Sequence, residues 1–179
     1  MDLGKRIMVM GSSGSGKSTL ARRLGELTGL PVVHMDTIWW KPGWVSTPAD
    51  EVYERATAAA DQPAWIFDGN YTKTRDYRLE RADTVIYLDF NRYVCIFRAI
   101  KRWIKNYGKS RPDMTEGCPE KIDLEFLKFI WGYPKRSRGN YLVWLAEIEP
   151  PKQVFHLKGN RAVKRFLKSL APPAPPAAS

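Results

Sequence analysis

Residues 11–18 read Gly-Ser-Ser-Gly-Ser-Gly-Lys-Ser and match the phosphate-binding pattern G-x-x-x-x-G-K-[ST] at every defined position. In this pattern the glycines let backbone N–H groups turn inward around nucleotide phosphates, the lysine reaches the β- and γ-phosphates, and the last hydroxyl is placed for Mg²⁺. We therefore expect ATP and Mg²⁺ as cofactors, with Lys17 as a catalytic cation and Ser18 as a metal ligand. The residues expected to bind the nucleotide in this loop are Gly11, Ser12, Ser13, Gly14, Ser15, Gly16, Lys17, Ser18 and Thr19.

The residues on either side of this loop support the match. Residues 6–10 form a short apolar run that is typical of a buried strand, and the residues after the loop carry Leu20, Leu24 and Leu27 at helical spacing. A strand, a glycine-rich loop and a helix N-terminus are together the arrangement that binds anions. A flexible Gly/Ser linker is the alternative interpretation, but it explains neither the Lys-Ser pair nor the two flanks.

Three apolar runs in the chain end in an aspartate, at Asp36, Asp68 and Asp89. A Mg²⁺ ion that bridges the β- and γ-phosphates needs a carboxylate at a strand end near the loop, and Asp68 and Asp89 match that requirement equally well. The choice depends on strand order, which these runs do not reveal. Asp36 is expected to accept a proton from an acceptor hydroxyl or to hold metal-bound water, and a loop cap or a surface ion pair is the alternative role for each acid.

Two pairs of arginines frame a polar segment in the second half of the chain. Arg98 and Arg102 lie four residues apart and so share one face of a helix, and Arg136 and Arg138 follow the polar segment. Phosphoryl transfer needs cations on the transferring group. We therefore predict that residues 98–140 form a lid that closes over the nucleotide phosphates, with a solvated helix face as the alternative.

A tryptophan-rich segment at residues 39–44 lies between two expected elements. Trp40 and Trp44 could stack on a base or another planar acceptor, or the tryptophans could attach a long loop to the core. The turn after Asp68 is expected to be part of the same site, because its glycine lets a ligand approach closely. The predicted acceptor residues are Asp36, Trp40, Trp44, Asp68, Gly69, Asn70 and Tyr71.

Composition limits the classes of protein to consider. The 179 residues fit one domain, and 44% hydrophobic residues with seven tryptophans predict a folded core. Two cysteines are too few for a disulfide scaffold, and the lack of a leader or of an apolar run of membrane length predicts a cytoplasmic protein without membrane contact.

The net charge is +10, and residues 91–140 alone carry twelve Lys/Arg against five Asp/Glu. This basic stretch suits the phosphates of a small substrate or a nucleic-acid backbone, or it is a solvated face.

Strand-like and helix-like segments alternate along the chain. Expected strands are at residues 6–10, 31–36, 64–68, 84–89 and 153–157, and expected helices are at 17–28, 48–61, 74–81, 92–106, 124–131, 135–147 and 161–170. The remaining expectations are N-caps at Thr47, Asn91, Asp123 and Asn160 and a helix break at Pro134. A loop is expected at 38–46, an exposed loop at 107–122, and a disordered Ala/Pro-rich tail at 171–179. The alternation predicts a parallel sheet with helices on both faces, whose ligands bind beyond the carboxyl ends of the strands.

Several longer blocks of the sequence resemble one known family. They are residues 11–19, the pattern Asp36…Trp40…Pro42-Gly43-Trp44, the heptapeptide Trp65-Ile66-Phe67-Asp68-Gly69-Asn70-Tyr71, residues 82–89, and Arg111-Pro112-Asp113…Gly117-Cys118-Pro119-Glu120. Together they are similar to bacterial P-loop proteins related to adenylate kinase, some of which are labelled DNA topology modulation proteins. The resemblance covers about residues 5–170. It implies the α/β fold of P-loop NTPases, with three layers, a five-stranded parallel sheet in the order 2-3-1-4-5 and a helical lid.

The resemblance also implies roles for single residues. Its strand order places the third strand beside the first, which favours Asp68 over Asp89 as the carboxylate for Mg²⁺. Asp68 and Gly69 match an Asp-Gly pair on the acceptor side of adenylate kinases, but Asn70 and Tyr71 stand where those enzymes continue with Phe-Pro-Arg, so the acceptor is not assigned to AMP. The family's lid arginines correspond to Arg98, Arg102, Arg136 and Arg138, and Arg161 would lie near the adenine.

The implied function is an ATP-dependent kinase that acts on a nucleotide or on another small acceptor. The alternative is a nucleotide-dependent regulatory protein that acts on DNA, which the label of the family suggests. No helix-turn-helix or zinc motif for reading bases is present in the sequence.

Overall fold

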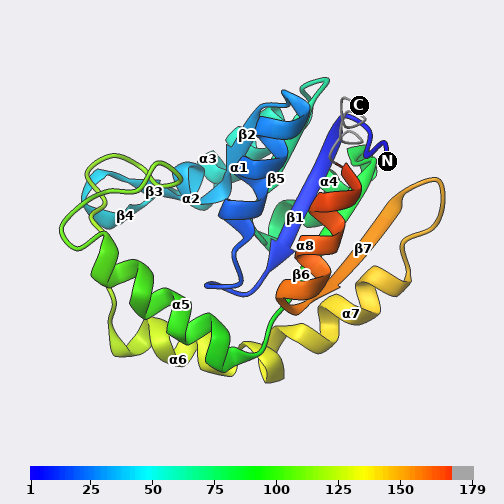
Figure 1. The fold of residues 1–179 in the computed structure, drawn as a ribbon. Coiled ribbons are helices and arrows are strands. Elements are labelled where there is room, and N and C mark those ends of the chain that lie inside the picture. The colour runs from blue at the N-terminus through cyan, green and yellow to red at the C-terminus, as the bar shows by residue number, and fades with distance from the viewer. Residues whose placement is uncertain (171–179) are drawn as a thin grey trace, which may run out of the picture.

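The computed structural model describes residues 1–170 of the chain. Its main sheet consists of five parallel strands, β1 (Arg6–Gly11), β2 (Val32–His34), β5 (Trp65–Asp68), β6 (Thr84–Asp89) and β7 (Gln153–Lys158), which lie side by side in the order β2-β5-β1-β6-β7 (Figure 1). Because β3 and β4 belong to a separate small sheet, this is the predicted order 2-3-1-4-5. The predicted α/β fold with a five-stranded parallel sheet is therefore confirmed.

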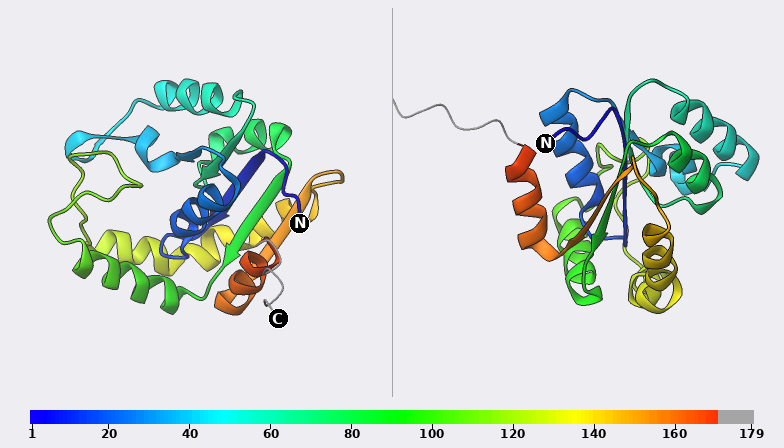
Figure 2. Two further views of the ribbon diagram at one scale, coloured as in Figure 1. Left: turned by 45° about the horizontal axis from the view of Figure 1, so that its top comes forward. Right: turned by 90° about the vertical axis from the view of Figure 1, so that its right-hand side faces the viewer.

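Helices cover both faces of this sheet (Figure 2). They are α1 (Lys17–Thr28), α2 (Met35–Trp39), α3 (Ala49–Ala60), α4 (Arg75–Arg81), α5 (Arg92–Lys105), α6 (Leu124–Tyr133), α7 (Gly139–Ala146) and α8 (Gly159–Leu170). The helices α1 and α8 lie on one face, and α3, α4 and α7 lie on the other (Figure 2). Helix α5 starts beyond the carboxyl end of β6 and runs past the loop that follows β1 (Figure 1).

The alternation of side chains along β1 explains the two hydrophobic layers, since successive residues of a strand point to opposite faces. Ile7 and Val9 pack into the layer under α1 and α8, whereas Met8 and Met10 pack into the layer under α3 and α7. All four side chains are fully buried. A parallel strand covered on both faces needs an unbroken apolar run of this kind.

The structure confirms two of the predicted helix caps and corrects the other two. Asn91 Oδ1 accepts a hydrogen bond from the N–H of Tyr93 at 2.9 Å, and Asp123 Oδ1 accepts one from Phe126 at 2.7 Å. Thr47 does not cap α3, because its buried hydroxyl has no partner within residues 1–170. Asn160 lies inside α8 instead of before it, and its side chain binds an arginine described below.

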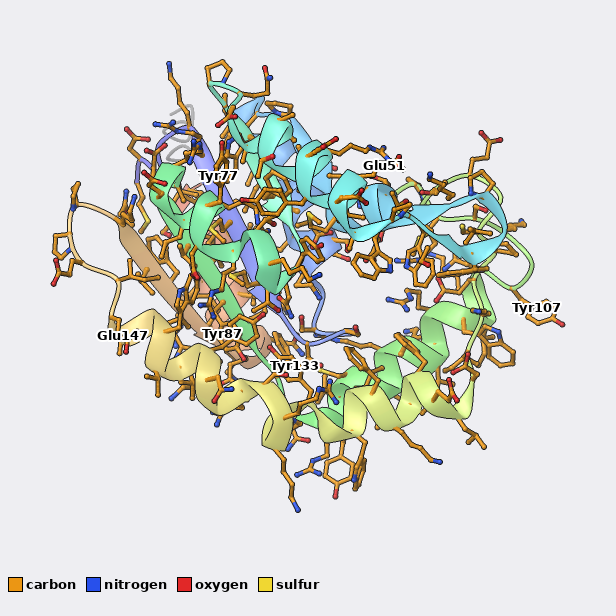
Figure 3. All side chains as sticks on the ribbon, turned by 180° about the vertical axis from the view of Figure 1, so that it is seen from behind. Glu51, Tyr77, Tyr87, Tyr107, Tyr133 and Glu147 are labelled. Carbon is orange, nitrogen blue, oxygen red and sulfur yellow. The ribbon has the colours of Figure 1, made fainter. Side chains whose placement is uncertain are left out.

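As predicted, the α-helix α6 ends at Pro134, which is its C-cap, but the chain keeps a helical conformation there. The chain continues from α6 through a wide π-turn, η3 (Pro134–Arg138), into α7, and Pro134 keeps helical torsion angles of φ −59° and ψ −39°. The missing N–H of a proline is tolerated where the helical hydrogen bonds shift their spacing. Tyr87 of β6 and Tyr133, the last residue of α6 before this bend, lie close together (Figure 3), with their hydroxyl oxygens 3.2 Å apart.

The segment predicted as a loop at residues 38–46 is instead folded. It contains the end of α2, the short strands β3 (Trp40–Lys41) and β4 (Val45–Ser46), and a 3₁₀ turn, η1 (Pro42–Trp44). A second 3₁₀ turn, η2 (Thr72–Thr74), precedes α4, and β2 ends at His34, two residues earlier than predicted. The predicted disordered tail at 171–179 lies outside the described residues.

The 107–122 segment is a loop, as the sequence predicts, but it is exposed only in part. It lies against β3 and β4 (Figure 1), where the N–H of Gly43 donates to the carbonyl of Gly117 at 2.9 Å and Thr115 Oγ1 donates to the carbonyl of Trp40 at 2.6 Å. Its side chains Met114 and Cys118 are buried. The segment therefore connects α5 and α6 to the side of the molecule that carries β2 and α2.

Candidate functional site

The phosphate-binding loop lies between β1 and α1, as the sequence predicts. Gly14 has φ +77°, and a Cβ added there would lie 2.2 Å from the carbonyl oxygen of Cys95 in α5, so only glycine fits. Lys17 Nζ donates a hydrogen bond to the carbonyl of Ser12 at 3.0 Å, and the N–H of Ser15 donates to the same carbonyl at 3.1 Å. These bonds curl the loop around the N-terminus of α1, which is the part of a helix that attracts anions.

Arg98 joins this loop to two helices. One guanidinium nitrogen donates to the carbonyl of Ser15 at 2.7 Å, another donates to Asn160 Oδ1 of α8, and the group stacks on Phe90 with 4.4 Å to the ring centroid. The nitrogen bound to Ser15 also lies next to Gly16, 3.6 Å from where a Cβ would be. A permanent positive charge is thus fixed beside the loop that is expected to hold phosphates.

Asn70 has a role that the sequence prediction missed. Its Oδ1 accepts from the N–H of Gly11 at 2.9 Å, and its Nδ2 donates to the carbonyl of Gly11 at 2.8 Å. Both ends of the amide are thereby committed to the first glycine of the phosphate loop. In this structure Asn70 holds the start of the loop, and its predicted contact with the acceptor stays a prediction.

We expect Asn70→Ala to raise KM for ATP by about tenfold, because losing two partly buried hydrogen bonds frees the start of the loop at a cost of about 1–2 kcal/mol. Steady-state kinetics with ATP as the varied substrate measure this change. Asn140→Ala is the matched control, since Asn140 is exposed on α7, and equal KM values for the two variants would contradict the role of Asn70.

The turn that carries Asn70 is held by Arg78, a second residue that the sequence prediction missed. Arg78 is fully buried and donates to the carbonyls of Gly69 at 3.0 Å, Tyr71 at 2.8 Å and Thr74 at 3.3 Å. Burial lowers the pKa of Arg78 to about 10, which leaves it charged at neutral pH. Within residues 1–170 no carboxylate pairs with this guanidinium. Its positive charge is instead stabilised by the backbone carbonyls to which it donates.

Gly69 lies at a position where packing within the protein requires a glycine, and the predicted approach of a ligand to it stays a prediction. Its φ is +134°, and a Cβ added there would lie 2.6 Å from the Cβ of Met35 at the start of α2. Tyr71, from the same turn, packs against Trp39 with 5.3 Å between ring centroids. The turn at residues 69–71 therefore holds α2 close to the carboxyl end of β5.

Asp68 presents a carboxylate oxygen without a partner. It is paired in register with Val9 of β1 and His34 of β2, and its side chain is only 6% exposed. Its Oδ2 lies 2.8 Å from Nδ1 of His34, whereas Oδ1 is buried and has no hydrogen-bond partner within residues 1–170. A buried, unpaired carboxylate oxygen is costly, and this one lies at the strand end beside the phosphate loop.

Asp36 lies in the first turn of α2, not at the end of a strand as predicted. Its side chain is exposed to solvent, although many protein atoms lie around it. The surrounding protein and the nearby carboxylate of Asp68 raise the pKa of Asp36, while the charges of Lys17 and Arg111 oppose this shift. These effects place Asp36 near both Asp68 and the phosphate loop.

Asp89 is the other candidate for the metal, but both of its carboxylate oxygens are bound by other side chains of the protein. Arg138 donates to both of its oxygens, at 2.8 and 2.7 Å, and Nε2 of His156 lies 2.8 Å from Oδ2. Although burial disfavours its charged form, the hydrogen bonds from Arg138 and His156 hold the pKa of Asp89 below its ordinary value. Of the two strand-end acids left open by the sequence, Asp68 is the one with a free oxygen.

The remaining predicted arginines do not meet at the phosphate loop in this structure. Arg102 Nε donates to Glu120 at 2.9 Å, and Arg136 donates to the carbonyl of Phe129 at 3.1 Å and stacks on its ring. Arg161 is exposed on α8. The predicted action of Arg102 and Arg136 on phosphates would require a rearrangement of the predicted lid, and the predicted place of Arg161 near the adenine stays a prediction.

The tryptophans at residues 39–44 attach this segment to the protein, one of the two roles that the sequence allows. Trp40 and Trp44 pack edge to face with 5.4 Å between centroids. Trp44 Nε1 donates to the carbonyl of Pro119 at 3.0 Å, and Lys121 lies 5.0 Å above its ring. Both tryptophans remain partly exposed.

The oxygens at this end of the sheet fit a magnesium ion that is held partly by phosphate. Within the described residues, no three His, Cys, Asp or Glu side chains gather into a metal-binding cluster. A Mg²⁺ ion in a nucleotide site needs no such cluster, because it keeps several waters and takes only one or two protein oxygens. The free Oδ1 of Asp68 and the hydroxyl of Ser18, in the first turn of α1, are oxygens of this kind.

Within residues 1–170, no helix is both long and apolar enough to cross a membrane.

Comparison with known proteins shows the fold. No model of a known protein family matches the chain, and no curated protein matches it in sequence. Among solved structures, a sugar kinase from Janibacter sp. HTCC2649 has a TM-score of 0.52 at 18% identity over 94% of this chain and 99% of that one. Shikimate kinase from Acinetobacter baumannii, solved with shikimate, has a TM-score of 0.55 at 16% identity over 93% and 90% of the two chains.

Shikimate kinase from Bacteroides thetaiotaomicron is similar to the same degree, with a TM-score of 0.53 at 16% identity over 93% of this chain and 95% of that one. At these identities the likeness concerns the fold, and the resemblance to the DNA topology modulation proteins stays a prediction. The chain therefore has the α/β fold that these kinases share.

Proposed function

We propose that the protein is an ATP- and Mg²⁺-dependent kinase that transfers the γ-phosphoryl group to a hydroxyl of a small acceptor. The observation that carries this proposal is that three groups follow neighbouring strands at the carboxyl end of the sheet: the phosphate loop with Lys17 after β1, the buried free oxygen of Asp68 at the end of β5, and the exposed carboxylate of Asp36 after β2. Ligands of parallel α/β sheets bind at this end. The similarity in fold to sugar and shikimate kinases agrees with the proposal.

On the donor side, Lys17 and the N–H groups at the start of α1 would hold the β- and γ-phosphates. Bound Mg²⁺ would supply positive charge to the phosphate oxygens, and Ser18 and Asp68 are the residues that would hold it. Arg98, already bonded to the loop, would stabilise the charge that develops in the transition state. Arg102 and Arg138 could join it only after leaving Glu120 and Asp89.

On the acceptor side, Asp36 would act as the general base. The acceptor oxygen attacks the γ-phosphorus, the bond to the β–γ bridging oxygen breaks, ADP leaves, and the hydroxyl proton passes to the carboxylate of Asp36. Asp36 is suited to this step because its side chain is exposed and its pKa is raised, which makes it a better proton acceptor than an ordinary aspartate. His34 would orient Asp68 through the bond at 2.8 Å.

The direct test is transfer of label from γ-labelled ATP to fractions of a deproteinised cell extract. We expect a labelled product that requires both the enzyme and Mg²⁺. Slow release of inorganic phosphate with no acceptor-dependent product would refute the kinase function.

The raised pKa of Asp36 predicts the pH dependence of the reaction. A general base must be deprotonated, so kcat/KM should fall as the pH is lowered through the pKa of Asp36, at a higher pH than an ordinary aspartate would cause. Asp36→Asn should lower kcat by about 10²-fold and remove this acidic limb. Glu54→Gln, at an exposed position of α3, is the control, and an unchanged acidic limb in Asp36→Asn would exclude Asp36 as the base.

The alternative, a regulatory protein acting on DNA, predicts DNA binding that weakens steeply with salt. In the basic stretch at 91–140, Arg98, Arg102, Arg111 and Arg138 bind other parts of the protein, whereas the lysines of this stretch are exposed. Lack of DNA binding at low salt would exclude the alternative.

A further inference from the structure

Most of the large apolar side chains that are exposed on this protein lie on one pair of helices. Of the thirteen such side chains within residues 1–170, nine lie between residues 93 and 131, on α5, on α6 or in the segment between them. They are Tyr93, Val94, Phe97, Ile100, Ile104, Tyr107, Leu124, Phe129 and Trp131. Single exposed apolar side chains are ordinary, whereas a contiguous group of them marks a surface that binds a partner.

On α5 these side chains form a stripe that faces away from the protein. The stripe has four members at intervals of four, three and four residues, the spacing that keeps side chains on one side of a helix. They are Tyr93, Phe97, Ile100 and Ile104. The opposite side of α5 is buried at Cys95, whose carbonyl lies next to the phosphate loop. The helix is thus apolar on two sides, and the protein covers one of them.

Helix α6 extends the stripe. The two helices lie side by side at one edge of the molecule (Figures 1 and 2). Trp131 of α6 packs edge to face on Tyr93 with 5.4 Å between ring centroids, and Arg92 lies 4.8 Å above the ring of Trp131. Leu124, seven residues before Trp131, shares its side of α6. We call the four members of the α5 stripe, together with Leu124 and Trp131, the outer face.

Exposed lysines lie beside the outer face. Lys101 comes four residues after one member of the α5 stripe and three before another, and Lys128 has the same spacing in the α6 part. Lys105 follows Lys101 by four residues, and Lys135 follows Trp131 by four. Within the described residues, the ion pairs that residues 91–140 make all use arginines. The charges of these four lysines are therefore not neutralised by a carboxylate of the described chain.

The exposed charge around the outer face is mainly positive. Residues 91–140 carry six exposed lysines, whereas two of their five acids, Asp113 and Glu120, are buried and a third, Asp123, caps α6. Glu116 and Glu125 are the remaining acids. An apolar stripe bordered by cations is complementary to a partner that has a negatively charged surface and an apolar interior.

The charge of the outer face argues against a second copy of this chain as the partner. A symmetric dimer brings the same patch of both copies together, so the lysines of one copy would lie against those of the other. The type of cation argues against another protein. Protein–protein interfaces are enriched in arginine and depleted in lysine, but the arginines of residues 91–140 are all bonded to, or stacked on, other residues of this protein.

A lipid bilayer with anionic head groups fits both observations. Lysine stems lie along apolar surface while their ammonium groups reach the head-group phosphates, and tyrosine and tryptophan are enriched at the same depth. A helix with this pattern lies in the plane of the bilayer surface, with its apolar side in the boundary between head groups and acyl chains.

We infer that the outer face binds the surface of an anionic lipid bilayer. The sequence predicts no membrane contact because it has no leader and no apolar run of membrane length, but a surface contact needs neither. The inference does not depend on the proposed kinase function. Because α5 contacts the phosphate loop with its opposite side, binding of a bilayer would leave that contact in place.

The test is sedimentation of the full-length protein with sucrose-loaded vesicles. One set contains phosphatidylcholine alone, and the other contains equal parts of phosphatidylcholine and phosphatidylglycerol. We expect binding to the mixed vesicles to be at least about tenfold stronger and to weaken when salt is added, since each lysine near an anionic surface strengthens binding about fivefold.

Two substitutions connect this binding to the outer face. Phe97→Ser should weaken binding to the mixed vesicles by at least about tenfold, because an apolar side chain no longer enters the bilayer. Lys101→Gln should weaken it by about fivefold. Phe97 is 66% exposed, so its replacement should leave the fold intact, which circular dichroism checks. The matched controls are Tyr53→Ser on α3 and Lys164→Gln on α8, at exposed positions of other helices, and both should bind as the wild type does.

No binding to the mixed vesicles at low salt would overturn the inference. Binding that Phe97→Ser and Lys101→Gln leave unchanged would also overturn it, because another surface would then make the contact. A dimer that forms without lipid and is lost in Phe97→Ser, measured by analytical ultracentrifugation, would show that a second copy covers the outer face instead.

Discussion

Substituting methionine for Lys17 is expected to lower kcat/KM for ATP by about 10³-fold, which in practice abolishes phosphoryl transfer. Lys17 is the first residue of α1, and its ammonium already lies inside the loop, bonded to the carbonyl of Ser12. Methionine retains the apolar stem but brings no charge to a reaction whose catalysis is almost entirely electrostatic stabilisation and positioning. Initial rates with γ-labelled ATP and a labelled-product assay measure the loss.

Arg22→Met is the matched control for this variant, because Arg22 is exposed on the same helix. It removes one positive charge from α1 and should leave kcat/KM within about twofold of the wild type. Circular dichroism should show the same helix content in both variants. If Lys17→Met transferred phosphate as fast as Arg22→Met, both the role of the loop and the proposed function would fail.

The donor half of the site could be predicted from the sequence because its signals are local. The phosphate loop needs a fixed run of eight residues, and the strand before it and the helix after it show their own periodicity. The neighbours of each strand cannot be predicted in this way, since an apolar run gives no information about which other run it pairs with in the sheet. The order of the strands was predictable only through the resemblance to a family, and it is confirmed.

The acceptor half could not be predicted because it depends on contacts between distant residues. Asp36 follows an apolar run and so resembles a strand-end acid, yet β2 ends at His34, whose imidazole binds Asp68, 34 positions later. The 107–122 segment has the Gly, Pro and charged residues of an exposed loop. Its acids Asp113 and Glu120 are nevertheless buried, because Arg111 neutralises both.

The roles of Asn70 and Arg78, which position other residues, could not be predicted either, because they too depend on contacts that only the folded structure reveals. Asparagine in a turn is ordinary, and only its two bonds to Gly11, 59 positions away, reveal that it holds the phosphate loop. An arginine in a short polar helix is expected at the surface. The burial of Arg78 becomes understandable only when the carbonyls of the 69–74 turn are seen to point at its guanidinium.

Arg78→Met is expected to lower the free energy of unfolding by about 3 kcal/mol. Methionine fills most of the space of the arginine stem, so the loss is chiefly that of the donors to Gly69, Tyr71 and Thr74. Each buried carbonyl left without a donor costs about 1–3 kcal/mol, and relief of the buried charge offsets part of the sum. Urea unfolding followed by circular dichroism gives the difference from the shift in midpoint at constant slope.

Arg81→Met is the matched control, three residues further along α4, where the guanidinium pairs with the exposed acids Asp61 and Glu80. Surface pairs of this kind contribute about 0–1 kcal/mol, so this variant should unfold close to the wild type. Because the 69–71 turn carries Asn70, Arg78→Met should also raise KM for ATP in the protein that remains folded, whereas Arg81→Met should not. Equal stability and equal KM in the two variants would show that the buried arginine does not organise the turn beneath the phosphate loop.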